Sequence, residues 1–177
     1  MPEPVIRPVA DPDRDAVIGI FNHYITTSFA AYPDKPVPPA FLAVLREGAY
    51  AFDVIEAGGE IVGFGILKPF LPFATFARTA TVTTFIDPAH RHQGYGTLLM
   101  ETMIREAKKR GIIMLLANIS SKNSESLVFH KKYGFFECGR MYEVGIKFNE
   151  IFDIVWMQKD LAPRQTVLKE ETVPLPD

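Results

Sequence analysis

The sequence predicts an α/β domain, and three features of its pattern carry that prediction. Segments rich in β-branched and aromatic residues alternate with segments whose apolar residues recur every three or four positions, as in a mixed sheet flanked by helices. Gly58-Gly59 separates two strand-like segments, which indicates a hairpin. The length of 177 residues is that of one ordinary globular domain.

The N-terminal part begins with the strand-like segment VIRPVA at residues 5–10. Asp11-Pro12-Asp13 then supplies an N-cap, a first-turn proline and a first-turn acid, which predicts a helix running to about Ser28. Several prolines interrupt the next segment. A second helix is predicted from about Ala40 to Glu47, and two strands are predicted on either side of Gly58-Gly59.

The central part starts with the aromatic, proline-containing segment PFLPFATFA, which predicts a loop. The β-branched run Thr79–Ile86 predicts a central strand, and the apolar periodicity of residues 94–110, closed by Gly111, predicts a long helix. An apolar strand follows at residues 112–118, and a short helix, SESLVFHKKYG, follows it. Two strands, FFECGRMYEVGI and IFDIVWMQKDL, complete a single domain at residues 1–161, and residues 162–177 form a polar tail expected to be flexible.

The composition restricts the partners and the compartment. A formal net charge of -2 and a pI near 6.1 give no basic field for nucleic acid, so a small anionic ligand is expected instead. The single cysteine, Cys138, rules out an internal disulfide and suits a reducing compartment. The N-terminus has no signal pattern and no apolar run is long enough to span a bilayer. We therefore expect a cytoplasmic protein with neither a membrane nor nucleic acid as its partner.

The segment RHQGYG lies between the predicted central strand and the long helix. Backbone N–H groups at a helix start have no internal partner and the helix dipole is positive there, so this turn can attract an anion. The alternative is a tight turn whose glycines serve geometry alone. Two common phosphate motifs fail, because Leu99 occupies the third glycine position of a dinucleotide fingerprint and Gly96 is followed by Thr97-Leu98 rather than Lys-Ser/Thr.

What remains is R-x-x-G-x-G, at Arg91, Gly94 and Gly96. With the flanking strand, helix and apolar strand, and with the segment SKNSESLVFHKKYGF, this resembles the acyl-CoA-binding core of the GNAT superfamily of N-acetyltransferases. The segments IRPVADPD, IFNHYITTS and VGIKFNEIFDIVWMQ are further similar to the branch that acetylates phosphinothricin and methionine sulfoximine. The resemblance extends over about residues 6–161.

The resemblance implies a GNAT fold, in which a mixed, mostly antiparallel, twisted sheet of about seven strands is flanked by helices. Strands four and five would splay apart to admit acetyl-CoA, the expected cosubstrate, and no metal is expected. The pantetheine arm would pair with the strand backbone and with Asn123, and the pyrophosphate would bind the turn. Taken alone, without the resemblance, Asn123 fits a helix cap or a surface residue better than a ligand contact. The expected cofactor-binding residues are Phe85, Ile86, Arg91, His92, Gln93, Gly94, Tyr95, Gly96, Thr97 and Asn123.

The chemistry is direct attack of an amine on the thioester, which needs a proton acceptor for the amine and a proton for the departing thiolate. The branch carries a histidine at the position of His130, which can pass a proton to sulfur or act as a base through water. Thr81 stands where the branch has a glutamate base, and threonine cannot replace it. The lone Cys138 is expected to be a small packed side chain rather than a nucleophile.

The acceptor is expected to lie near Phe73, Phe76 and Arg78, although the phenylalanines could also belong to the core or to a subunit interface. Ala77 stands where the branch has a carboxylate-binding arginine, and Arg78 would face the other way unless a β-bulge redirects it. Without such a bulge, the acceptor could lack the α-carboxylate of phosphinothricin and methionine sulfoximine. VGIKFN resembles a segment that crosses a dimer, so a homodimer is expected. The expected function is acetyl transfer from acetyl-CoA to the primary amine of a small molecule, an amino acid or a toxic analogue. The alternatives are a catalytically weak acetyl-CoA-binding module and a protein N-acetyltransferase.

Overall fold

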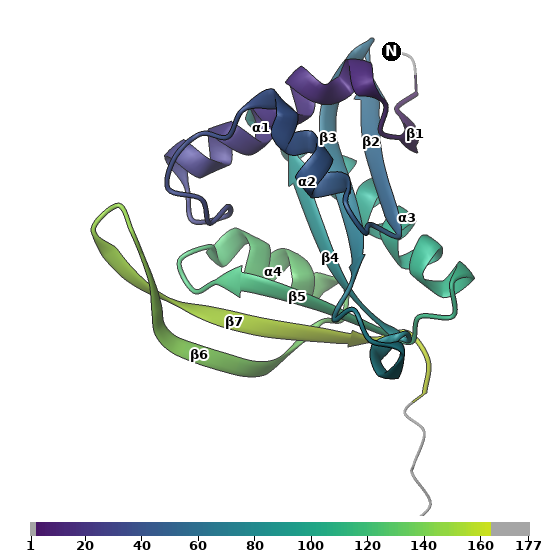
Figure 1. Cartoon of the computed structure of the whole chain (residues 1–177), viewed down its shortest axis with the longest axis vertical. Helices are drawn as coiled ribbons and strands as arrows, with labels where there is room; N and C mark the ends of the chain where they lie inside the picture. Colours follow the sequence, from purple (N-terminus) through teal and green to yellow (C-terminus); the bar gives the residue numbers. More distant parts are fainter. Residues whose placement is uncertain (1–2, 164–177) are drawn as a thin grey trace, which may run out of the picture.

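The computed structural model describes residues 3–163 and contains one seven-stranded mixed sheet (Figure 1). The strand order is β1-β2-β3-β4-β5-β7-β6, and each neighbouring pair is antiparallel except β4 with β5. The predicted mixed, mostly antiparallel sheet is thus confirmed. The strands are β1 (Val5–Pro8), β2 (Ala51–Ala57), β3 (Glu60–Pro69), β4 (Thr79–Ile86), β5 (Met114–Ser120), β6 (Phe136–Lys147) and β7 (Glu150–Asp160).

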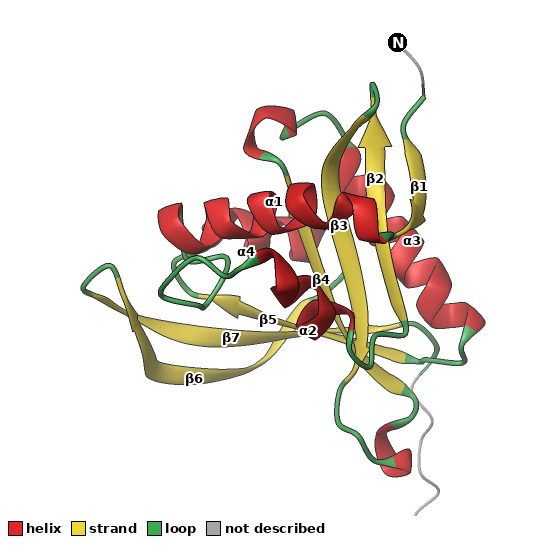
Figure 2. Cartoon of the chain, turned by 45° about the horizontal axis from the view of Figure 1, so that its top comes forward, coloured by secondary structure: helices red, strands yellow, loops and turns green. Residues whose placement is uncertain are grey.

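Four α-helices cover the described sheet, and Figure 2 shows α1 in front of the strands and α3 behind them. They are α1 (Arg14–Thr27), α2 (Leu42–Arg46), α3 (Tyr95–Lys109) and α4 (Ser124–Lys132). One buried cluster joins α1 to β2, β3 and β4 through residues such as Phe21, Phe64 and Phe85. A second joins α3 and α4 to the other face through residues such as Met103 and Phe135.

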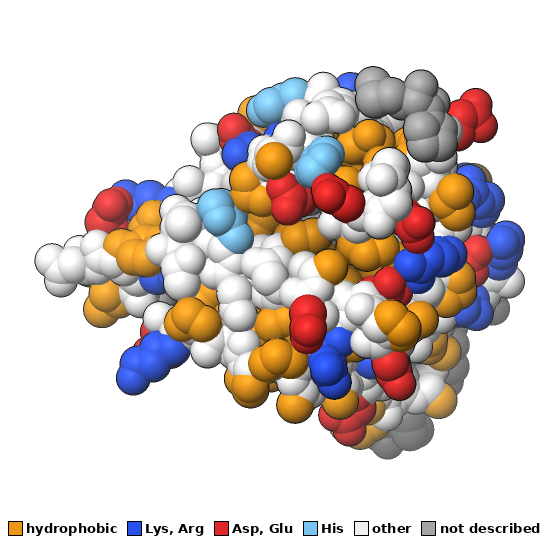
Figure 3. Space-filling view, turned by 90° about the horizontal axis from the view of Figure 1, so that it is seen from above, with side chains coloured by type: hydrophobic (Ala, Val, Ile, Leu, Met, Phe, Trp, Pro, Cys, Tyr) orange, Lys and Arg blue, Asp and Glu red, His pale blue; other side chains and the backbone are white. Residues whose placement is uncertain are grey.

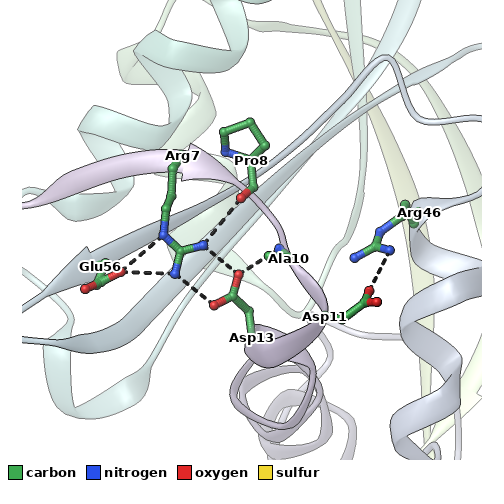
Figure 4. A network of polar contacts seen from close by, with 7 residues as sticks. All are labelled: Arg7, Pro8, Ala10, Asp11, Asp13, Arg46 and Glu56. Carbon is green, nitrogen blue, oxygen red and sulfur yellow. Dashed lines mark hydrogen bonds and ion pairs between the residues drawn. The ribbon is translucent and has the colours of Figure 1, made fainter.

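The first α-helix begins later than the sequence predicts, because a 3₁₀ turn precedes it. Residues 11–13 form a 3₁₀ turn and α1 starts at Arg14. The buried carboxylate of Asp13 accepts bonds of 2.7 and 2.8 Å from Arg7 and one of 2.8 Å from the Ala10 N–H (Figure 4). The Arg7 guanidinium, which also contacts Glu56 of β2, holds the pKa of Asp13 below its usual value. This network fastens the start of α1 to the β1–β2 edge.

The predicted splay between strands four and five is confirmed. Only Thr79, Ala80 and Thr81 pair with β5, opposite Met114, Leu115 and Leu116. Beyond these pairs β4 continues along β3 to Ile86, while β5 continues along β7 to Ser120. The two strands therefore diverge, as Figure 1 shows, and each leaves one backbone edge without a strand neighbour. We call their last shared pair, Thr81 with Leu116, the fork.

Other boundaries differ for local reasons. The second predicted helix divides into a 3₁₀ turn at Pro39–Phe41 and α2. Strand β5 starts at Met114 rather than residue 112, because the Ile112 N–H bonds the Ala107 carbonyl at 3.0 Å and still belongs to the end of α3. The tail expected at 162–177 lies, apart from its first two residues, outside the described part of the chain.

Figure 3 shows how charged side chains are distributed on one face of the molecule. On the face drawn in Figure 3 the acidic and basic side chains lie among one another, without a continuous basic area. None of the described helices is long and apolar enough to cross a membrane. Within residues 3–163 no three histidine, cysteine, aspartate or glutamate side chains are grouped so that they could hold a metal ion.

Candidate active site

The RHQGYG turn has an unusual backbone at the start of α3. His92 and Gly94 both adopt left-handed conformations, with φ of 62° and 87°. A Cβ at Gly94 would have nothing within 4 Å, so the space in front of this residue is open. The first intrahelical bond of α3 runs from the Leu98 N–H to the Gly94 carbonyl at 3.2 Å, which leaves the preceding helical N–H groups available. An open, left-handed turn with free amides fits a phosphate.

The arginine of this turn is already paired. Arg91 forms an ion pair with Glu125 in the first turn of α4, and its side chain is 35% exposed. Gln93 makes only a long contact of 3.5 Å to the Ala89 carbonyl, and His92 is exposed. The backbone amides that follow Gly94 therefore form the phosphate-binding site, which we call the cradle. Arg91 can bind an anion only if it leaves its exposed ion pair with Glu125, which is a weak interaction.

The register of β4 corrects one predicted contact. The Phe70 N–H bonds the Thr79 carbonyl and the Asp87 N–H bonds the Val62 carbonyl, so odd-numbered backbone groups of β4 face β3. By alternation the groups of Thr84 and Ile86 face the opened side, and those of Phe85 do not. The predicted backbone role of Phe85 is therefore wrong and passes to Thr84. The Phe85 ring is buried instead in the α1 cluster.

The carbonyl of Ile86 has a hydrogen-bond partner that no sequence pattern predicted. The Tyr24 hydroxyl of α1 donates a 2.5 Å bond to it. Burial raises the pKa of Tyr24, so its hydroxyl stays protonated and keeps donating near neutral pH. At the opened edge this leaves the Ile86 N–H, together with the backbone of Thr84, for a peptide-like ligand.

Gly96 differs from Gly94. A Cβ at Gly96 would lie 3.5 Å from the Phe129 ring of α4 and 3.7 Å from the Ile86 side chain, which are ordinary contacts. Gly96 therefore lies where α3 approaches α4, rather than in open space.

We expect Gly96→Ala to bind acetyl-CoA within about threefold of the parent and to raise the free energy of unfolding by about 0.5–1 kcal/mol, since alanine is the better helix former. Calorimetric titration and urea unfolding measure the two quantities. Binding weakened tenfold or more would show that the Gly96 position itself must stay bare for the ligand.

The first residue of the α4 motif has the capping role that the sequence left open. Asn123 Oδ1 accepts a 3.2 Å bond from the Ser126 N–H and closes the N-terminus of α4. Its side-chain NH2 group takes no part in the cap. The same residue can therefore cap the helix and donate to a ligand, so the two interpretations are compatible.

His130 is 5% exposed, and its ring packs edge-on against Phe135 at a centroid distance of 5.0 Å. Its Nδ1 lies 2.8 Å from the Ser126 carbonyl, which can only accept, so Nδ1 carries the proton. Burial lowers the pKa of His130, while the bond to Ser126 opposes that shift. The ring is therefore neutral near pH 7, and its Nε2 carries a lone pair.

That Nε2 atom is buried without a hydrogen-bond partner among residues 3–163. His90 Nδ1 is the other such atom in the described chain, but it lies 3.5 Å from the Asp87 carboxylate. Buried polar atoms are normally satisfied, so an orphaned imidazole nitrogen calls for a partner from outside the chain. In this tautomer Nε2 can accept a proton but has none to give.

Thr81 lies at the fork. Its Oγ1 is 3.5 Å from the Lys68 carbonyl, and the Lys68 residue stands opposite it on β3. The Lys68 ammonium donates a 3.1 Å bond to the Val44 carbonyl of α2. Strand β4, TATVTTFI, contains no carboxylate. Strand β4 therefore offers no carboxylate base at the fork.

The predicted acceptor residues are only partly brought together. Phe76 packs edge-on against Phe70, and Phe70 packs against Trp156 of β7, at centroid distances of 5.7 and 6.1 Å. Phe73 is 63% exposed and belongs to neither contact. Arg78 is exposed, and the β3–β4 register has no shift that could serve as the redirecting bulge. The sequence reasoning missed Trp156, which lay in a segment assigned only as a strand.

Cys138 is exposed on β6, with its Sγ 3.5 Å from the Trp156 carbonyl. The expectation of a packed side chain is therefore wrong. Strand β6 lies at the edge of the sheet and is exposed on both faces from Phe136 to Val144, which explains the exposure of Cys138.

Comparisons with known proteins agree with this geometry. The model of the acetyltransferase (GNAT) family matches residues 17–135. An L-methionine sulfoximine/L-methionine sulfone acetyltransferase of Pseudomonas paraeruginosa is 28% identical over 166 residues, which cover 91% of this chain and 96% of that protein. A phosphinothricin N-acetyltransferase of Alcaligenes faecalis is 29% identical, covering 93% of this chain and 86% of that protein. A Salmonella typhimurium protein solved with its cofactor acetyl-CoA superimposes with a TM-score of 0.85 at 26% identity, over 95% of this chain and 99% of that one.

Proposed function

The chain belongs to the acetyltransferase (GNAT) family and is an acetyl-CoA-dependent N-acetyltransferase, and we propose that its acceptor is the primary amine of a free amino acid or amino-acid analogue. The observation that carries the proposal is the fork, where β4 and β5 part next to an open, left-handed turn at the start of α3. Methionine sulfoximine and phosphinothricin, named for the relatives, are the first acceptors to test.

Acetyl-CoA supplies an activated acetyl group, and the chain supplies binding and proton handling. We assign the pyrophosphate to the amides that follow Gly94, and the pantetheine arm to the free edge of Thr84 and Ile86 with the NH2 group of Asn123. The His130 Nε2 lone pair accepts, through water, the proton that the amine loses as the C–N bond forms, and the imidazolium then returns a proton to the CoA thiolate released when the C–S bond breaks. Thr81 contributes space at the fork rather than a base.

This chain has Ala77 where the branch has a carboxylate-binding arginine, so another cation must bind an acceptor carboxylate. Lys68 faces Thr81 across the β3–β4 ladder, which brings an ammonium to the side of the fork that α1 and α2 cover. The packed rings of Phe70, Phe76 and Trp156 support an apolar side chain on the acceptor. An amino acid with an apolar or thioether-like side chain satisfies both features.

The test is a panel of amines assayed by release of the free CoA thiol. It contains L-methionine sulfoximine, L-phosphinothricin, the common amino acids, their decarboxylated amines and short peptides. Fastest turnover with a free amino acid supports the proposal. Turnover with peptides alone would favour the protein acetyltransferase, and binding of acetyl-CoA without thiol release from any amine would favour the binding module.

We further propose a homodimer that forms through β6. This strand ends the sheet order, so no described strand covers its outer edge. It exposes apolar side chains, including Tyr142 at 75%, Ile146 at 74% and Val144 at 47%. Such an edge needs a cover. Sedimentation should show twice the chain mass for the parent and the single mass for Ile146→Asp, and a monomeric parent would refute the dimer.

We propose a cytoplasmic location, where the exposed Cys138 thiol stays reduced.

A further inference from the structure

Lys147, at the end of β6, is buried although it is a lysine. It is 7% exposed, and its ammonium donates bonds of 2.7 Å to the Ser28 carbonyl and 2.6 Å to the Ala31 carbonyl. No described carboxylate lies within ion-pair distance of it. Burying an ammonium is costly, and burial lowers the pKa of Lys147 accordingly. The contacts of the Lys147 ammonium must therefore offset this cost.

The two carbonyls explain how the charge is tolerated. Ser28 is the C-cap of α1, and Ala31 lies in the turn just beyond it. The last carbonyls of a helix have no intrahelical donor and lie at the negative end of the helix dipole. Lys147 therefore caps α1 from a strand that is distant in sequence, and it fixes the path of residues 28–32, which we call the acceptor loop.

The turn after Lys147 holds the same loop by its ring. Phe148 and Asn149 form a two-residue hairpin turn with φ of 51° and 60°. A left-handed conformation is unfavourable for a bulky side chain, and Asn-Gly would relieve it. The Phe148 ring packs edge-on against Phe29 of the acceptor loop at 5.5 Å, and the Lys147 ammonium lies 5.0 Å from its centroid. These contacts account for a phenylalanine in a strained position.

The acceptor loop reaches the opened side of β5. The Tyr32 ring stacks on Phe152 of β7, with centroids 6.1 Å apart and ring planes 5° from parallel. Its hydroxyl donates a 3.3 Å bond to the Asn118 carbonyl. Asn118 lies two residues beyond Leu116, which is the last residue of β5 that pairs with β4. Burial raises the pKa of Tyr32 to about 12, so this hydroxyl remains a donor.

From these contacts we propose that Lys147 is a positioning residue for the acceptor. Its ammonium holds the acceptor loop so that Tyr32 stays against β5 on the side of the fork that α1 covers. The inference rests on the proposed function for the identity of that side as the acceptor side. It predicts that loss of the ammonium weakens the acceptor more than it weakens acetyl-CoA.

The test is Lys147→Met, which keeps most of the buried side-chain volume and removes the donor. We expect the KM for L-methionine sulfoximine to rise about tenfold, because two charge-assisted bonds that order the loop are lost, while the KM for acetyl-CoA stays within about twofold. Lys122→Met is the matched control, since Lys122 contacts Glu150 of the same hairpin from an exposed position; both KM values should match the parent. A folded Lys147→Met enzyme with unchanged KM for the acceptor would overturn the proposal.

Amide hydrogen exchange gives a readout that does not depend on activity. In Lys147→Met the amides of residues 29–32 should exchange at least about tenfold faster, while those of α3 keep their protection. If Lys147→Met does not fold, Tyr32→Phe tests the same loop by removing only the bond to Asn118, and parent-like exchange and acceptor KM in that variant would overturn the proposal. A parent that acetylates no amine but shows the exchange difference would refute the proposed acceptor and retain the role of Lys147 in holding the loop.

Discussion

Gly94→Val is expected to raise the Kd for acetyl-CoA about 100-fold, the equivalent of one or two charge-assisted hydrogen bonds from the turn to phosphate. Gly94 has a φ of 87°, and a Cβ there would enter space that is open in front of the turn. A β-branched residue disfavours this conformation by about 1–2 kcal/mol and fills the phosphate approach at the same time. Calorimetric titration with acetyl-CoA measures the loss.

The control variant Gly111→Val distinguishes the effect of backbone strain in Gly94→Val from the effect of filling the space in front of the turn. Gly111 ends the same helix, also has a left-handed φ, of 73°, and also has nothing within 4 Å of its Cβ position. Both variants should therefore lose similar stability in thermal unfolding, but Gly111→Val should bind acetyl-CoA like the parent. Equal affinities of Gly94→Val and Gly111→Val for acetyl-CoA would show that the cradle does not bind the cofactor.

Much of the sheet could be predicted because its signals are local. The β-branched run of β4 and the hairpin at Gly58-Gly59 gave the observed strands, since propensity and turn chemistry act over a few residues. The pattern did not predict that residues 11–13 form a 3₁₀ turn before α1, in which the Asp13 carboxylate binds Arg7 of β1 and the Ala10 N–H.

The sequence could predict which positions belong to the candidate site, but not which atoms of these residues face it. Residue counting placed β4 and the turn, whereas the choice between Thr84 and Phe85 depends on the register with β3, which no local pattern encodes. The role of Lys147 depends on contacts with a loop more than a hundred residues away. The resemblance gave His130, but only its burial and its bond to Ser126 show which nitrogen is free.

His130→Asn is expected to lower kcat about 100-fold while leaving the Kd for acetyl-CoA unchanged, which is the usual scale of losing one general base. The asparagine NH2 group can replace Nδ1 as donor to the Ser126 carbonyl, so the structural bond is kept and only the Nε2 lone pair is lost. Single-turnover and steady-state assays of thiol release measure kcat. His23→Asn is the control, because His23 is exposed on α1, and it should retain full activity.

The pH dependence supplies a second, independent check on His130. Burial lowers the pKa of His130 below the reference value of 6.5, so the decrease of kcat/KM that depends on His130 should lie below about pH 6.5, where Nε2 becomes protonated. Between the folded pKa and 6.5 the unfolded chain binds more protons than the folded one, so the free energy of unfolding decreases as the pH falls through this window. His130→Asn should lose both the kinetic and the stability slope in that range. If the parent profile falls with a midpoint above pH 6.5, the titrating base is not this buried imidazole.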